Sequence, residues 1–178
     1  RFRRRRRIRV MVNIGRWLRH VFAPPWRWRR AFPRATLDAI EAAVRASETH
    51  HGGEIRFAVE NGLAPMRAWR GLSGRERAVE VFSQLRVWDT EHNSGVLIYL
   101  LLADHDIEIV ADRGVAARVP QAAWDEVAHA MEARLRQGDF EGGALAGIER
   151  VGALLQQHFP PPRDNPDELE NRPVLLRR

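Results

Sequence analysis

The sequence predicts an α/β fold, a three-layer α/β/α sandwich built on a small mixed sheet. Val96–Leu102 is an unbroken apolar run, typical of a strand that is buried on both faces. After the turn 103–106, the stretch Ile107–Val110 alternates apolar and charged residues, which predicts an antiparallel hairpin partner with one wet face. Glu54–Glu60 alternates as well, and a helical pattern at Arg75–Arg86 separates it from the central strand. This succession is a βαβ unit, which makes the first and central strands parallel.

Apolar residues at helical spacing predict the remaining helices. Ile8–Phe22 has the pattern of a basic amphipathic helix. A second helix is expected to open at Thr36, a residue type that caps helices, and to end near Glu48. Pro120 opens a third helix that Gly138 closes, and Phe140–His158 forms the last one. The segment 61–74, with its proline and glycines, is expected to be a loop.

The charges divide the chain into three parts. Residues 1–34 contain 13 of the 29 basic residues and no acid, so the remainder carries 16 arginines against 23 acids, a net charge of −7. We therefore expect a basic N-terminal arm and linker (1–35), an α/β/α domain (36–158) and a proline-rich acidic tail (159–178). Either the first ten residues are a basic arm for RNA or anionic lipid, or they are upstream sequence and Met11 is the natural start.

Composition excludes several kinds of chemistry. The chain has no cysteine, which excludes disulfides, zinc–cysteine sites and thiol catalysis, and it has no lysine for a Schiff base or a P-loop. HExxH and GxGxxG motifs are absent from the sequence. Arginine beside tryptophan can stack on bases, but no RNA-binding signature accompanies it, so nucleic acid is not expected as a partner.

The basic amphipathic segment Ile8–Phe22 could lie on a membrane surface. No apolar stretch approaches the length of a membrane span, and Arg16 and Arg19 interrupt any signal-peptide core. These features predict a cytoplasmic protein with peripheral contact to the inner membrane.

Several segments together resemble the TPM domain family, which includes YgcG-type and photosystem II repair protein domains. Asn93–Ile98 is similar to the family's "(D/N)NGVLL" start of the central strand, and Phe140–Gly143 to its "G.Y..G" step. The helix with Ala78, Phe82 and Leu85 resembles its "YA..LF..W" helix. The resemblance implies an α/β/α sandwich that often binds Ca²⁺ or Mg²⁺. A plant member is associated with acid phosphatase activity, and bacterial members are encoded beside LemA-type membrane proteins, which implies such a partner.

Topology predicts where polar side chains meet. Residues that enter the two parallel strands and residues that leave the antiparallel strand share one end of the sheet. Carboxylates with imidazoles suit a divalent metal, and carboxylates alone suit Ca²⁺ or Mg²⁺. We therefore predict a metal site at this rim, formed by His51, Glu54, Asp89, His92 and Asp112.

The opposite end of the sheet is the carboxyl end of the parallel pair, the usual ligand crevice of open α/β sheets. It offers Glu60, Asn61 and the turn residues Asp104, His105 and Asp106, although aspartate in such a turn also has a plain structural explanation.

These observations predict a divalent-metal-binding, protein-interaction module. One rival is a metal-dependent phosphatase of phosphate monoesters, in which Asp89 or Glu54 orients water and Arg113 meets the phosphate. The other rival is a membrane-surface adaptor that uses Ile8–Phe22. No nucleophile motif accompanies the serines, so no catalytic residue is assigned from the sequence.

Overall fold

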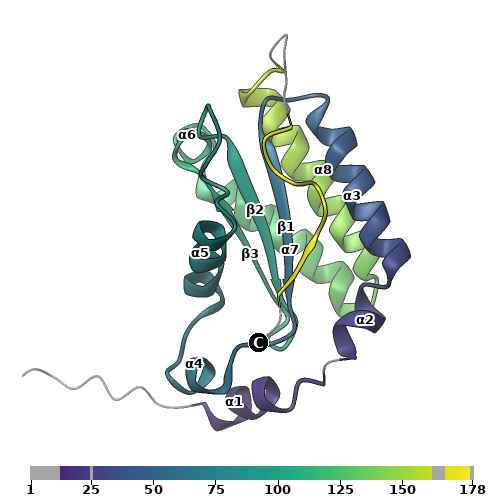
Figure 1. Ribbon diagram of the computed structural model, residues 1–178, viewed down its shortest axis with the longest axis vertical. Coiled ribbons are helices and arrows are strands. Elements are labelled where there is room, and N and C mark those ends of the chain that lie inside the picture. The colour runs from purple at the N-terminus through teal and green to yellow at the C-terminus, as the bar shows by residue number, and fades with distance from the viewer. Residues whose placement is uncertain (1–12, 25, 162–166, 177–178) are drawn as a thin grey trace, which may run out of the picture.

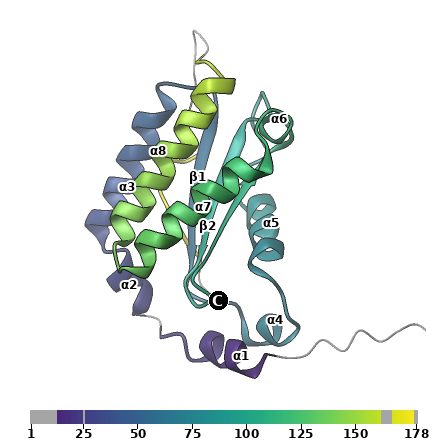
Figure 2. The same ribbon diagram turned by 180° about the vertical axis from the view of Figure 1, so that it is seen from behind.

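The computed structural model describes residues 13–24, 26–161 and 167–176. Its helices are α1 (Ile14–Val21), α2 (Arg27–Ala31), α3 (Arg34–Glu48), α4 (Pro65–Trp69), α5 (Gly74–Gln84), α6 (Arg113–Ala116), α7 (Gln121–Arg136) and α8 (Phe140–His158). Its strands are β1 (Glu54–Glu60), β2 (Gly95–Leu101), β3 (Asp106–Ala111) and β4 (Val174–Leu176). Figures 1 and 2 show the arrangement from two opposite sides.

The four strands form one mixed sheet in the order β3-β2-β1-β4. β1 and β2 are parallel, with Glu54 opposite Gly95, and β3 returns antiparallel to β2. β4 is parallel to β1 on its other edge. The predicted α/β class with a βαβ unit and an antiparallel hairpin is confirmed.

Two apolar cores lie on the two faces of the sheet. Ile55, Phe57 and Val59 of β1 belong to the larger core, which α3, α7 and α8 cover. Ala58 of the same strand and Tyr99 of β2 belong to the smaller core, with α5 and apolar residues of α4 and of the C-terminal segment. Helices therefore lie on both sides of the sheet, as the two views show (Figures 1 and 2).

Three local expectations are corrected. α3 begins at Arg34 behind Pro33, so Thr36 is not its cap; the Thr36 hydroxyl instead donates to Glu141 of α8. The expected loop 61–74 contains α4, which opens with proline at its first position. The N-terminal helix begins at Ile14, capped by Asn13, and residues 8–12 of the predicted helix lie outside the described part of the chain.

Within the described residues, no helix combines the length and the apolar character that crossing a bilayer requires.

Candidate metal centre

Every residue of β1 is buried, including the charged residues on its polar face. Glu54, Arg56 and Glu60 alternate with the core residues and point to the opposite face, where water would normally solvate them. Each instead has a protein partner. Arg56 donates to Glu170 of the C-terminal segment at 2.9 Å, and Arg77 of α5 donates to Glu60 at 2.8 Å. The C-terminal segment and α5 thus complete the third layer with charged contacts.

Glu54 differs from its neighbours because its surroundings are acidic. Carboxylate oxygens of Glu48, Glu54 and Asp167 all lie within 4.8 Å of one another. Glu48 ends α3, Glu54 begins β1, and Asp167 belongs to the C-terminal segment, which runs along β1 toward β4 (Figure 1). Three separate segments therefore bring one carboxylate each to a single point.

Backbone donors hold two of these carboxylates in place. The backbone N–H of Ile55 donates to Glu48 at 2.8 Å, and that of Leu169 donates to Glu54 at 3.2 Å. Glu48 is 7% exposed and Glu54 is 4% exposed, whereas Asp167 lies at the surface. The arrangement is a partly enclosed, preformed acidic site with one open side.

The electrostatics of the cluster favour a positive ion. Burial, the main cause, raises the pKa of Glu48 to about 8 and that of Glu54 to about 7. The negative charge of Asp167 adds to both shifts, and the backbone hydrogen bonds oppose them. Glu48 also sits at the C-terminal end of α3, where the helix dipole is negative and cations are favoured.

The donor chemistry fits a hard cation. All three groups are carboxylates, which Ca²⁺ and Mg²⁺ prefer, and neither ion uses only three oxygens. A further oxygen is close: the side-chain amide of Asn171 donates to Asp167 at 2.9 Å, while its own oxygen is buried and has no hydrogen-bond partner among the described residues. The residues present therefore suit either ion, with water supplying the remaining ligands.

The structure brings one of the five sequence-predicted ligands into this cluster, namely Glu54. Glu54 and Asp112 do lie at the same end of the sheet, as predicted. Gly95 lies opposite Glu54, and its carbonyl accepts from the backbone N–H of Asp112 at 2.8 Å. The side chains nevertheless diverge. Asp112 accepts from the backbone of Arg113 at 2.7 Å as the cap of α6, and its second carboxylate oxygen is buried without a hydrogen-bond partner in the described structure.

The other three predicted ligands lie elsewhere. His51 is fully buried between α3 and α8, 2.9 Å from the Ser47 hydroxyl, and burial lowers its pKa to about 4, so its ring is neutral. Asp89 is at the surface and pairs with Arg86 at 2.6 Å. His92 lines a shallow hollow beside Arg118. Among the described residues, the group of three close ligands is Glu48, Glu54 and Asp167.

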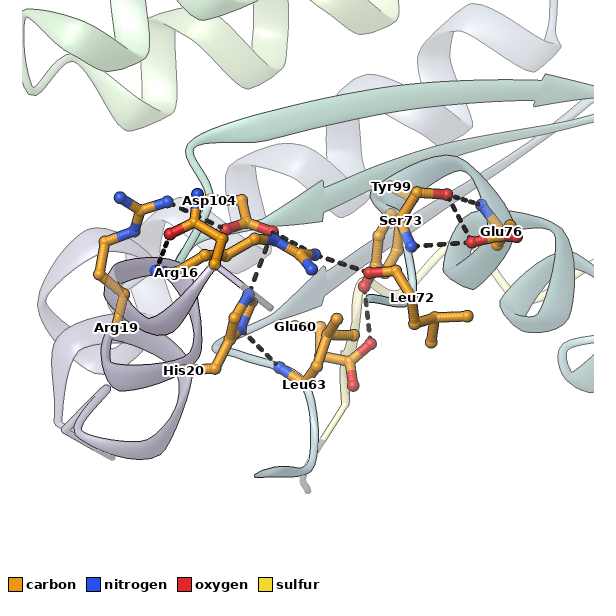
Figure 3. Close-up of polar contacts among 11 residues, drawn as sticks. Arg16, Arg19, His20, Glu60, Leu63, Leu72, Ser73, Glu76, Tyr99 and Asp104 are labelled. Atoms are coloured by element: carbon orange, nitrogen blue, oxygen red, sulfur yellow. Dashed lines mark hydrogen bonds and ion pairs between the residues drawn. The ribbon is translucent and has the colours of Figure 1, made fainter. Parts of the chain in front are cut away.

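The opposite sheet end holds two more carboxylates with cationic partners, Glu60, which is buried, and Asp104, which is half-buried. Glu60 accepts from Arg77 at 2.8 Å and from the Tyr99 hydroxyl at 2.7 Å, and burial together with the Glu60 charge raises the pKa of Tyr99. Asp104 accepts from Arg16 of α1 at 2.8 Å. Figure 3 shows the Tyr99–Glu60 contact and the Arg16–Asp104 contact. The carboxylates of Glu60 and Asp104 are consequently paired with arginine, unlike those of the Glu48–Glu54–Asp167 cluster.

Comparison with known proteins agrees with the fold and the motifs. The family model of the TPM domain matches residues 29–154, and the chain belongs to this family. The solved structure of the BA42 protein from the psychrophilic bacterium Bizionia argentinensis is 32% identical, with a TM-score of 0.70 over 79% of this chain and 92% of that one. The N-terminal domain of a protein from P. gingivalis is 19% identical, with a TM-score of 0.56 over 71% and 77% of the two chains, and supports the fold alone. No curated protein matches the chain.

Proposed function

We propose that this TPM domain is a divalent-cation-binding interaction module, and that Ca²⁺ or Mg²⁺ binds at Glu48, Glu54 and Asp167. The observation that carries the proposal is the convergence of three carboxylates from three segments within 4.8 Å. Like charges at this spacing repel, and burial of two of them increases the cost. A divalent cation would offset both the charge repulsion and the cost of burying the carboxylates.

The proposed role of the ion is to fasten the C-terminal segment to the domain. Asp167 is the ligand from this segment, and β4 follows it on the edge of β1. Glu48 and Glu54 belong to α3 and β1, which form the body of the domain. Cation binding would therefore stabilise the attached position of residues 167–176. A LemA-type membrane protein remains the partner that the family resemblance implies.

A metal-dependent phosphatase is the rival function for the same site. A cationic side chain beside the metal strengthens the binding of a phosphate monoester. Arg56, on the same face of β1 as Glu54, is occupied by Glu170 and by the Arg172 carbonyl. Arg113 contacts Asn93 at 3.3 Å, near Asp112 rather than in the cluster. These contacts favour binding over phosphate hydrolysis.

The test is isothermal titration calorimetry of the chelator-treated full chain with CaCl₂ and with MgCl₂. The variants Glu48→Gln, Glu54→Gln and Asp167→Asn should each weaken binding at least about tenfold, because each removes one charged ligand. Glu126→Gln is the matched control: it makes the same change at an exposed side chain of α7 that is not part of the cluster. It should bind the ion as the parent does.

The outcomes separate the alternatives. Equal affinity of all four variants and the parent would refute the site. Loss of binding in Asp89→Asn together with full binding in Glu48→Gln would point instead to the rim residues predicted from the sequence. Hydrolysis of p-nitrophenyl phosphate that requires the ion, and that disappears in both Glu48→Gln and Glu54→Gln, would favour the phosphatase.

A further inference from the structure

Helix α1 is attached to the domain through its polar side. Arg16 donates to Asp104 at 2.8 and 3.0 Å and to the Leu72 carbonyl at 2.7 Å. His20 is completely buried, and its Nε2 lies 3.1 Å from Asp104. The backbone N–H of Leu63 donates to the Nδ1 atom of His20 at 3.1 Å, which orients the ring with Nε2 toward the carboxylate. Figure 3 shows these side chains pointing from α1 toward the turn after β2.

The apolar side of α1 consequently faces outward. Ile14, Leu18 and Phe22 follow at intervals of four, which places them on one face, and they are 61%, 39% and 73% exposed. A surface helix of a globular protein normally shows the reverse, with its apolar stripe against the core. The orientation is fixed by the contacts with Asp104.

Helix α4 and the linker after α1 extend this apolar surface. α1 packs on α4, where the Trp17 and Trp69 rings meet edge to face at 5.6 Å and the Trp17 indole donates to the Pro65 carbonyl. Met66 and Trp69 are exposed, as is Trp26 in the linker. Six of the eight exposed large apolar side chains among the described residues therefore belong to segments 14–26 and 66–69, which we call the α1/α4 surface.

The α1/α4 surface and the residues that flank it in the sequence contain arginines and no acidic residue. Residues 13–34 and 61–72 contain eight arginines and no acid, although the chain from residue 35 onward has a net charge of −7. Arg19, Arg29 and Arg70 are exposed at this end. The partner of this surface must therefore offer both negative charge and an apolar interior.

We propose that the α1/α4 surface lies on an anionic lipid bilayer, with α1 in the plane of the interface. Apolar side chains and tryptophans at the headgroup level, flanked by arginines, are the features of helices that bind in this way. A symmetric dimer through this surface would bring two acid-free, arginine-bearing segments together, which charge repulsion opposes. The surface is separate from the carboxylate cluster, so the inference does not depend on the proposed function.

Co-sedimentation of the full chain with phosphatidylcholine vesicles, with and without 30% phosphatidylglycerol, tests the proposal. The parent should partition into the anionic vesicles, and Leu18→Glu and Phe22→Glu should each lower the partition coefficient at least about tenfold. Val79→Glu on α5 is the matched control, because Val79 is 46% exposed and the charge change is the same. It should bind as the parent does.

Quenching of tryptophan fluorescence by brominated acyl chains is a second measurement of membrane contact, and it does not use the charged variants. Trp26→Phe should remove part of the quenching, whereas Trp88→Phe, which alters a 47% exposed residue outside the α1/α4 surface, should not.

Equal vesicle binding by the parent and Phe22→Glu would overturn the proposal, as would a parent that stays in the supernatant with anionic vesicles. A dimer detected by light scattering in the absence of lipid, and lost in Phe22→Glu, would overturn it in favour of self-association.

Discussion

Asp104→Asn should release α1 from the domain. The Asp104 carboxylate is 12% exposed and receives Arg16 at 2.8 Å, His20 at 3.1 Å and, more distantly, Arg19 at 3.6 Å. Asparagine keeps the size of the side chain and removes its charge. The variant therefore tests whether this single carboxylate selects the inward face of α1.

The magnitude follows from the pKa of Asp104. Burial, the largest single influence, raises this pKa, but the hydrogen bonds from His20 and Arg16 and the charges of these two side chains outweigh it, and the pKa falls from 3.8 to about 2. A shift of this size corresponds to about 2 kcal/mol. Because the folded-state pKa is the lower one, this stabilisation is fully present above about pH 4 and is lost as the pH falls toward 2.

Urea denaturation of the parent and Asp104→Asn between pH 2 and pH 7 measures the effect, and hydrogen exchange locates it. We expect the variant to be less stable by about 2 kcal/mol at pH 7 and the difference to shrink below pH 4. The amides of α1 should exchange faster in the variant. A difference that is the same at pH 2 and pH 7, or unchanged α1 exchange, would refute the reasoning.

Three further predictions concern buried charge. Arg77→Leu leaves the Glu60 carboxylate without its guanidinium and should lower the free energy of unfolding by about 3–5 kcal/mol, whereas Tyr99→Phe removes one neutral donor and should cost about 1–2 kcal/mol; both are read from urea denaturation. Calcium at a hundred times the parent's Kd should raise the free energy of unfolding by about 2.7 kcal/mol in the parent and by about 1.4 kcal/mol or less in Glu48→Gln, whose affinity is at least about tenfold weaker; thermal denaturation would show the difference. Without an ion, the raised pKa values of Glu48 and Glu54 mean that the folded state holds protons that the unfolded state releases, so stability should fall as the pH rises from 4.5 to about 8; a flat profile over this window in chelator-treated protein would contradict the buried cluster.

The sheet and most helices were predictable because their signals are local. The alternation of Glu54–Glu60 gives β1 with its true bounds, and the helical spacing of Phe140–His158 gives α8 in the same way. α4 and β4 have weak local signals, since each is very short and depends on tertiary contacts. β4 forms because Val174–Leu176 meets the free edge of β1.

The candidate site was harder to predict because it depends on distant segments. The topology placed Glu54 at the correct end of the sheet, but Asp167 reaches it only after the chain has returned along β1. The acidic run before β4 was the available signal for this ligand. For α1, the periodicity showed which residues share a face of the helix. Which face packs inward depends on the contact with Asp104, which lies 88 positions from Arg16 in the sequence.

The cation site is tested most directly by a crystal structure of the full chain grown with CaCl₂. Our account predicts an ion at about 2.3–2.6 Å from carboxylate oxygens of Glu48, Glu54 and Asp167. An ion coordinated instead at Asp89 or Asp112, or a cluster that holds only water at saturating calcium, would contradict it.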